Sequence, residues 1–319
     1  RRNVIKKCLS SPSRELLCEL DRAGVDLADE IAAATPALSA LSQAAMASIL
    51  LAIHSLGFSI LGLDPAAPAK GSAKPLPASA LSDLRSQQFA VVPGFLTTEE
   101  VGAYREDVAK LRAEGRFKTA GIGETATNRV DNTVRVCEQC FIYPPQRHRG
   151  FGDDAARERL YATLDGVRDS LCQLTPLEPL LTEGLYAHYP NGGYYRRHVD
   201  AAPNNPSELR AFSYLLYLND AWEPEHGGCL RIHTDGYGED APISAPESYV
   251  DVEPRGGTLV VFRSDTMAHE VLNTNAERQA VAGWFNRPVG GSGFRQTLIK
   301  GLGAAVALAA LGKVAGGDK

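Results

Sequence analysis

Residues Tyr189–Asp200 read YPNGGYYRRHVD. The Pro-Asn-Gly-Gly run is typical of a tight turn, and the tyrosines on both sides favour extended backbone, so the segment predicts a strand, a turn and a second strand. The second strand ends in His198-Val199-Asp200. Because residues i and i+2 of a strand point to the same side, we expect His198 and Asp200 to offer a cation an imidazole and a carboxylate from one face.

A third metal ligand is expected in His269, which is separated from Asp200 by enough chain for several strands. Two imidazoles and one carboxylate on a single face leave the remaining coordination positions of a metal free. The His-x-Asp pattern recurs at 233–235, where it runs into a glycine and indicates a strand end and turn instead of a ligand pair. His269-Glu270 begins like a zinc-protease helix, but Asn273 occupies the position of the second histidine, so that class of hydrolase is excluded.

The pattern of elements predicts a mainly β fold with flanking helices (α+β). One helix begins at a capping-box spacing formed by Thr97 and Glu100. Apolar residues then repeat at helical spacing in two places: Val101, Tyr104, Val108 and Leu111, and Leu160, Leu164, Val167 and Leu171. Five short runs bounded by turn residues predict strands: 184–189, 212–218, 229–233, 257–262 and 279–285.

Composition divides the chain into four segments. Residues 1–64 are alanine-rich and predict a helical N-terminal extension, 65–79 form a Pro/Ala-rich linker, 80–290 hold the main domain, and 291–319 form a Gly/Ala-rich tail. The longest apolar run, 44–63, could just span a bilayer, but it contains His54, serines and glycines. A helix packed on the domain or paired with 15–34 is therefore favoured over a membrane anchor.

Charge and cysteine content limit the partners and the compartment. A net charge of −5 without a basic stripe argues against affinity based on phosphate contacts, so no nucleic-acid partner is expected. Six cysteines in 319 residues imply no disulfide framework, and the CxxC at Cys137–Cys140 is interpreted as two ordinary cysteines. We therefore favour a reducing intracellular compartment, cytoplasm or nucleus; organelle or membrane association stays open because the chain starts at Arg1.

Six separated motifs occur in one order along the chain. They are Tyr189–Asp200 (YPNGGYYRRHVD), Tyr214–Asp220 (YLLYLND), Gly227–Ile232 (GGCLRI), Thr258–Phe262 (TLVVF), Ser264–Val271 (SDTMAHEV) and Arg278–Phe285 (RQAVAGWF). Together they resemble the prolyl 4-hydroxylase family of iron(II)- and 2-oxoglutarate-dependent dioxygenases, above all the HIF-type enzymes and their microbial relatives. The resemblance covers Gln88 to Pro288 and implies a double-stranded β-helix, or jelly-roll barrel, with iron at its open end.

The resemblance also implies a pocket for 2-oxoglutarate. Arg278 matches the basic residue that holds the distal carboxylate of this co-substrate, and Tyr217 matches a tyrosine that shares the carboxylate. Tyr189 and Leu230 match residues that line the pocket. A guanidinium suits the first role because it presents two parallel donors to a carboxylate and keeps its charge.

Two further residues are implied near the substrate. Trp284 matches a tryptophan that borders the substrate proline, and it shares a strand face with Arg278 because the two are an even number of residues apart. Arg210 matches an arginine near the substrate entrance. Core packing of Trp284 and a solvated loop position for Arg210 are the alternatives.

The activity implied by the resemblance is hydroxylation of a prolyl residue in a protein or peptide. It would use Fe(2+), 2-oxoglutarate and O2, release succinate and CO2, and depend on L-ascorbate to rescue oxidised iron. A dioxygenase of the same fold acting on another residue or a small molecule stays open, as does a catalytically silent metal-binding jelly-roll module. The segment after Asp200, AAPNNPSELRAF, is longer and richer in proline than expected, so the identity of the substrate is not predicted.

Overall fold

The structure is a computed structural model that describes residues 73–288, apart from 123–128, 144, 146, 204–205 and 235–247. All but the last of these residues belong to one compact unit, Pro68–Arg287. The predicted extension 1–64, its apolar run 44–63 and the tail 291–319 lie outside the described residues. The first described helix begins at Ala78, inside the segment expected to be a linker, and Leu76 before it is already buried.

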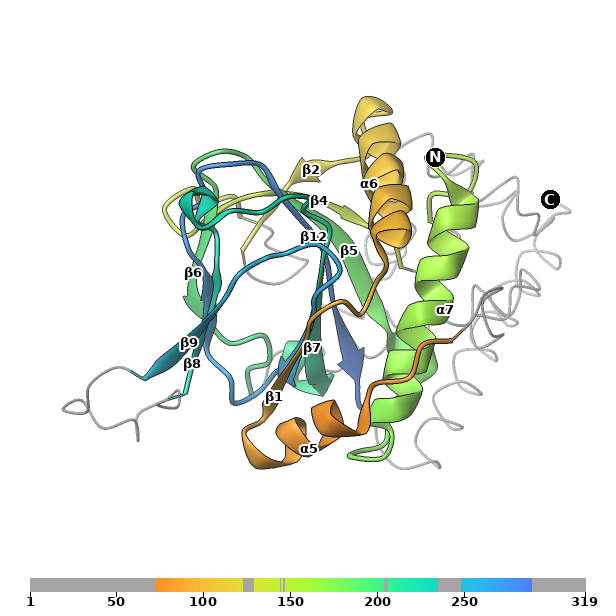
Figure 1. Cartoon of the computed structure of the whole chain (residues 1–319), viewed down its shortest axis with the longest axis vertical. Coiled ribbons are helices and arrows are strands. Elements are labelled where there is room, and N and C mark those ends of the chain that lie inside the picture. The colour runs from red at the N-terminus through yellow and green to blue at the C-terminus, as the bar shows by residue number, and fades with distance from the viewer. Residues whose placement is uncertain are drawn as a thin grey trace, which may run out of the picture. The chain divides into compact units, whose positions relative to one another are not determined.

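Two antiparallel sheets form the body of the described region (Figure 1). In spatial order the larger sheet consists of β1 (Phe89–Val92), β10 (Leu259–Arg263), β7 (Arg210–Tyr217), β12 (Arg278–Asn286), β5 (Glu183–Tyr189), β4 (Glu138–Phe141) and β2 (Lys118–Thr119). The smaller sheet consists of β3 (Arg135–Val136), β6 (Tyr194–His198), β11 (His269–Val271), β8 (Leu230–His233) and β9 (Tyr249–Val252). The two sheets remain separate in the described residues, so they form no closed barrel.

Helices cover the outer face of the larger sheet. They are α5 (Ala78–Ser86), α6 (Thr98–Ala113) and α7 (Asp154–Leu171), and short 3-10 turns lie at Pro179–Leu181, Pro206–Leu209 and Pro224–His226. The predicted capping box of α6 is confirmed, because the backbone N–H of Glu100 donates to Thr97 Oγ1 at 3.2 Å and that of Thr97 donates to a Glu100 carboxylate oxygen at 2.8 Å. In Figure 1, α6 and α7 lie side by side against the sheet.

The hydrophobic core has two layers. One lies between the helices and the larger sheet, and it contains the predicted apolar residues of both helices. The other lies between the two sheets and includes Tyr217, Leu230 and Phe262. The second layer joins the two sheets, and the ring centre of Phe262 in this layer lies 4.5 Å from that of His269.

A buried polar network joins the helices to the larger sheet. Asp107 of α6 is fully buried and accepts hydrogen bonds from the Arg157 guanidinium of α7 and, at 2.8 Å, from the Tyr186 hydroxyl of β5. Removing one partner of such a buried pair leaves an uncompensated charge, which is strongly destabilising. The network therefore fixes both helices on β5.

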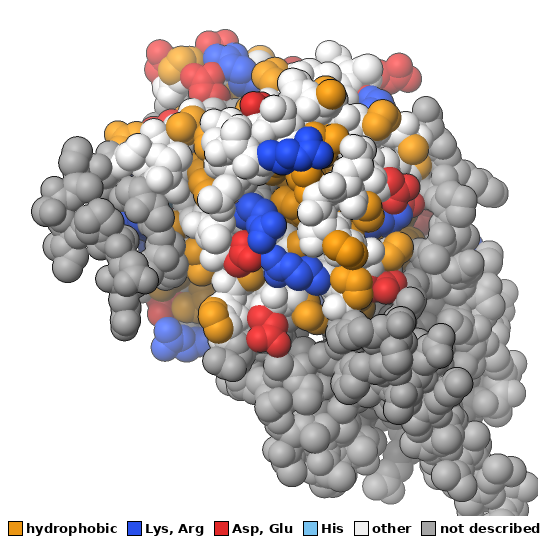
Figure 2. Space-filling view, turned by 90° about the horizontal axis from the view of Figure 1, so that it is seen from below, with side chains coloured by type: hydrophobic (Ala, Val, Ile, Leu, Met, Phe, Trp, Pro, Cys, Tyr) orange, Lys and Arg blue, Asp and Glu red, His pale blue; other side chains and the backbone are white. Residues whose placement is uncertain are grey.

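The surface of the described region has mixed charge. On the face shown in Figure 2, basic and acidic side chains lie close together among hydrophobic ones. Within the described residues, no helix combines the length and the apolar character that a membrane crossing requires. The apolar run 44–63 lies outside that search.

Candidate active site

Strand pairing brings the three predicted ligands together. His198 ends β6, and His269 begins β11, which is antiparallel to β6 with these two histidines as direct cross-strand partners. Directly opposed residues point to the same face of a sheet. The loop after β6 is fixed because the backbone N–H groups of Asp200 and Ala201 donate to Ser264 O at 3.2 and 3.0 Å. Asp200 thus lies beside His198 as expected, but β6 ends at His198, so the loop after the strand places the carboxylate.

The three side chains present one ligand atom each, all within 4.8 Å of one another. His198 Nε2 lies 3.4 Å from Asp200 Oδ1, and His269 Nε2 lies 3.5 Å from Asp200 Oδ2. Among the described residues, no other group of three His, Cys, Asp or Glu side chains meets this criterion. His233 lies elsewhere, with its Nε2 3.2 Å from Glu270 Oε1, so it is not part of the cluster.

The surroundings fix which ring nitrogen of each histidine faces the cluster. His198 Nδ1 lies 2.7 Å from Arg196 O, and His269 Nδ1 lies 3.0 Å from Met267 O. A proton on Nδ1 that is donated to a carbonyl leaves the Nε2 lone pair for a metal. The Ser213 hydroxyl donates to Asp200 Oδ2 at 2.7 Å and so orients the carboxylate.

The electrostatics favour the metal-binding protonation states. Burial opposes ionisation of Asp200, but the adjacent His269 and His198 outweigh burial and hold the pKa of this carboxyl well below its usual range. Burial lowers the pKa of His269 to about 4, although Asp200 acts in the opposite direction. At neutral pH the cluster therefore has an ionised carboxylate and a neutral His269 imidazole, the forms that bind a metal ion.

Next to the cluster lies a buried cradle of unpaired donors. Arg278 is fully buried on β12; its Nε donates to Gly228 O at 2.9 Å, whereas its Nη1 and Nη2 have no hydrogen-bond partner among the described residues. The buried Tyr217 hydroxyl likewise has no partner in the part of the chain that the structure describes. The Arg278 Cζ lies 5.1 Å from the ring centres of both Tyr217 and Tyr189, and Leu230 is fully buried in the same core layer as Tyr217.

A buried hydrogen-bond donor without an acceptor lowers the stability of the folded protein, and an acceptor that reaches the donor removes this penalty. A dicarboxylate that brings one carboxylate to Arg278 and Tyr217 would satisfy all three donor groups. Burial raises the pKa of Tyr217 to about 12 despite the nearby Arg278, so its hydroxyl keeps its proton for donation. The residues predicted for the co-substrate pocket thus lie together, and they fit 2-oxoglutarate.

At the rim of the site Arg210 stacks on Trp284. The Arg210 Cζ lies 3.6 Å from the Trp284 ring centre, and its nitrogens donate to both carboxylate oxygens of Glu183 at 3.2 and 3.0 Å and to Asp200 O at 3.1 Å. Arg210 begins β7, so the alternative of a solvated loop charge is wrong. Trp284 is half-buried, and its indole N–H has no partner. No contact here identifies a substrate.

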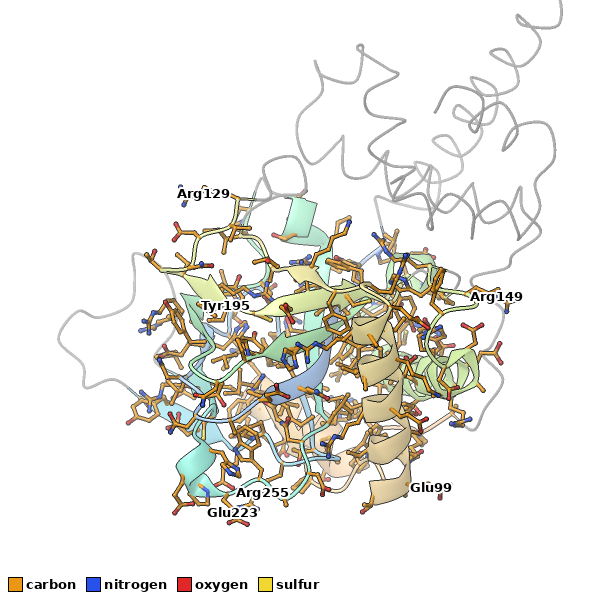
Figure 3. The ribbon with its side chains drawn as sticks, turned by 90° about the horizontal axis from the view of Figure 1, so that it is seen from above. Glu99, Arg129, Arg149, Tyr195, Glu223 and Arg255 are labelled. Atoms are coloured by element: carbon orange, nitrogen blue, oxygen red, sulfur yellow. The ribbon has the colours of Figure 1, made fainter. Side chains whose placement is uncertain are left out.

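Two residues outside the predicted ligand and co-substrate sets lie close to the cluster: Tyr195, whose sequence context indicates a strand residue at the rim, and Arg135, which no sequence pattern marked. Tyr195 stacks on His198 with ring centres 3.7 Å apart, and the Arg135 guanidinium covers the Tyr195 ring, with Cζ 4.6 Å from its centre. Figure 3 shows Tyr195 on the side of the molecule opposite Arg149. Cys137 and Cys140 are buried and free, in agreement with their interpretation as ordinary cysteines.

Comparisons with known proteins identify the family. A family model described as the 2OG-Fe(II) oxygenase superfamily matches residues 184–286. A crystal structure of a Pseudomonas putida prolyl-4-hydroxylase is 31% identical, with 66% of this chain and 99% of that chain covered at a TM-score of 0.54. This chain belongs to the 2OG-Fe(II) oxygenase superfamily. The prediction of a double-stranded β-helix is thereby confirmed for this oxygenase. Its described residues form the two antiparallel sheets of that fold.

Two other solved structures are similar to this oxygenase. One is a prolyl hydroxylase from Trichoplax adhaerens in complex with a hypoxia inducible factor peptide fragment, at 23% identity, 65% and 87% coverage and a TM-score of 0.49. The other is the non-heme alpha ketoglutarate dependent carbocyclase SnoK from nogalamycin biosynthesis, at 16% identity, 68% and 86% coverage and a TM-score of 0.49. Membership of the superfamily makes the protein a dioxygenase that uses Fe(2+), 2-oxoglutarate and O2.

Proposed function

We propose that this oxygenase hydroxylates a prolyl residue of a protein or peptide, with iron held by His198, Asp200 and His269. Arg278 and Tyr217 bind the distal carboxylate of 2-oxoglutarate. The observation that carries the assignment of the site is a three-ligand cluster together with buried donors that have no partner among the described residues. Prolyl specificity is supported by the 31% identity to a prolyl-4-hydroxylase over 99% of that enzyme.

In this proposal iron and 2-oxoglutarate supply the oxidising chemistry, in which O2 and 2-oxoglutarate give succinate, CO2 and the hydroxyl group of the product. The protein binds and orients the reactants. The Arg278 guanidinium donates to the distal carboxylate and neutralises its charge, and the Tyr217 hydroxyl donates to the same carboxylate. Tyr189 and Leu230 line the pocket with buried rings and methyl groups and so exclude water from it.

The substrate would enter at the rim formed by Arg210 and Trp284. Because Arg210 is held by Glu183 and by Asp200 O, its guanidinium provides a rigid flat surface next to a metal ligand and not a free charge. A proline ring can pack on such a surface through its apolar face. L-ascorbate is expected to sustain turnover by reducing iron that has become oxidised.

One assay tests the proposal. The full chain is supplied with Fe(2+), ascorbate, labelled 2-oxoglutarate and proline-rich protein fractions, and both succinate and oxygen gain of peptides are measured by mass spectrometry. We expect both products, loss of both in His198→Ala, and retention of both in His226→Ala, which removes an imidazole outside the cluster. Turnover that survives His198→Ala would refute the iron site.

The same assay separates the proposal from its alternatives. Oxygen gain on other residues, or only on small molecules, would replace the prolyl substrate but keep the site. Omission of ascorbate should shorten the period of linear turnover without changing the initial rate. Absence of 2-oxoglutarate consumption with every substrate class would favour a silent metal-binding module.

A further inference from the structure

We propose that Arg135 is a specificity-determining residue that binds a carboxylate of the substrate, so that the preferred substrate is an acidic peptide. This inference rests on the proposed function and extends it. It concerns β3, a strand of two residues at the edge of the smaller sheet.

Strand register directs Arg135 toward the site. Arg135 of β3 is the direct partner of Tyr195 of β6, so both side chains leave the same face of the sheet. The Tyr195 ring stacks on His198, and the Arg135 guanidinium lies on the Tyr195 ring. One aromatic ring therefore separates the guanidinium from a metal ligand. A group bound by Arg135 would be a close neighbour of the reacting part of the substrate.

Arg135 has no acidic partner. Among the described residues no carboxylate lies within salt-bridge distance of its guanidinium; Nη2 contacts only Cys137 Sγ at 3.7 Å, and the buried Nε has no partner. Its electrostatic neighbours are the Cys137 thiol and the hydroxyls of Tyr189 and Tyr195. A partly desolvated guanidinium without a counter-charge is costly, and a carboxylate ligand would offset that cost.

Other arginines near the cluster do not share this feature. Arg210 is neutralised by Glu183, and Arg278 has the buried position proposed for the distal carboxylate of 2-oxoglutarate. The half-buried Arg135 is therefore left for a carboxylate from a second molecule, the substrate. An acidic side chain close to the target residue of a peptide would supply it.

The chain offers a matched control in Arg196 of β6. Its guanidinium lies 4.1 Å from the ring centre of Tyr194, so it too stacks on a tyrosine, and no ion pair is formed with a described residue. Tyr194 is adjacent in sequence to Tyr195 and Arg196 stacks on Tyr194, so both lie on the face opposite Tyr195. His198 shares the face of Tyr195 and not that of Arg196, because the register between β6 and β11 shifts between these residues. Arg196→Gln removes the same charge from the same pair of strands without touching the site-facing side.

The test uses end-blocked peptides that contain one proline and either glutamate or glutamine at each flanking position. Their Kd values are measured by calorimetry with the full chain, Mn(2+) and 2-oxoglutarate, and oxygen gain is measured in parallel with Fe(2+). We expect the wild type to bind the best glutamate peptide about 10- to 100-fold more tightly than its glutamine counterpart, the range for one charge-assisted hydrogen-bond pair. The ratio should fall to about one in Arg135→Gln and persist in Arg196→Gln.

A charge-reversal variant distinguishes direct binding of the substrate by residue 135 from a structural effect of the substitution. Arg135→Glu should prefer the same peptide with lysine in place of glutamate, an inversion that simple misfolding cannot produce. Equal affinities of the wild type for glutamate and glutamine peptides, or a preference that survives Arg135→Gln, would overturn the assignment of Arg135. Charge-selective binding without oxygen gain would refute prolyl hydroxylation and leave the Arg135 site intact, whereas no binding of any peptide would overturn both.

Discussion

Replacing Arg278 with methionine should separate co-substrate binding from stability. The two terminal nitrogens of Arg278 are buried, and within residues 73–288 no described side chain pairs with them or neutralises the guanidinium. Each charge-assisted hydrogen bond to a carboxylate contributes about 1.5–3 kcal/mol, and two such bonds give about 3–6 kcal/mol. The Kd for 2-oxoglutarate should therefore rise about 100- to 10,000-fold in Arg278→Met.

Thermal unfolding with Mn(2+) shows both effects. At 2-oxoglutarate about 100 times above the wild-type Kd, binding stabilises the wild type by about 2.7 kcal/mol, which corresponds to roughly 5–10 °C for a domain of this size. If Arg278→Met weakens binding at least about 100-fold, 2-oxoglutarate raises its unfolding temperature by only about 1–2 °C or less. Without 2-oxoglutarate the unfolding temperature of Arg278→Met should equal or exceed that of the wild type, because a buried unpaired charge has been removed.

The control is Arg231→Met, which breaks a partly exposed ion pair with Asp251 on the neighbouring strand. Such pairs contribute about 0–1 kcal/mol to the stability of the fold. Because the Arg231 guanidinium is held by Asp251 and not by the cradle, the Kd for 2-oxoglutarate should not change. A Kd in Arg278→Met within a few fold of the wild-type value would refute the cradle. A large fall in the unfolding temperature of the metal-loaded protein without 2-oxoglutarate would show that Arg278 serves the fold instead.

Three further predictions follow from other contacts. Ser213→Ala removes the donor to Asp200 Oδ2 and should weaken Mn(2+) binding about 10- to 100-fold in calorimetry; an unchanged Kd would exclude this role. Burial lowers the pKa of His269 from 6.5 to about 4, so between these values the unfolded chain takes up a proton that the folded chain does not. The free energy of unfolding of the metal-free protein should therefore fall by about 3 kcal/mol as the pH drops through this interval, and a flat profile in urea titrations would contradict this. In urea titrations Gly283→Ala should lower the free energy of unfolding by about 2–3 kcal/mol, because a Cβ would overlap a backbone oxygen of β5 and a tyrosine hydroxyl of β7. The control Gly102→Ala lies in open space on α6 and should raise the free energy of unfolding slightly.

Local sequence patterns were sufficient to predict many of the helices and strands of the fold. The apolar repeat and capping box gave α6, because helix signals involve residues three and four positions apart. The five predicted strands correspond to β5, β7, β8, β10 and β12 within a few residues. The pairing of His198 with Asp200 also followed from local geometry. His269 was expected as the third ligand because enough chain separates it from Asp200 for several strands, but the long-range pairing of β11 with β6 is what brings it to His198.

Other features depend on long-range pairing and left no local pattern. β3 has two residues and is defined by its pairing with β6, so nothing in the sequence around Arg135 marks it as a site-facing strand. Asn219, directly after β7, is buried; its side-chain N–H donates to Pro254 O at 2.7 Å, and its side-chain oxygen accepts from the Gln279 backbone N–H at 2.7 Å. Helix α5 was not predicted, and its first two residues, Ala78 and Ser79, fall inside the expected linker 65–79.

The Asp107 network has a consequence for how the molecule opens. It joins α6, α7 and β5, so the amides of these three elements are expected to exchange with deuterium together, in the slowest class. Tyr189 lies at the end of β5 and shares that protection, whereas β3 is held at a sheet edge by the pairing of two residues. Co-substrate would then meet a surface that is already fixed, while the edge that bears Arg135 can still adjust to an incoming peptide.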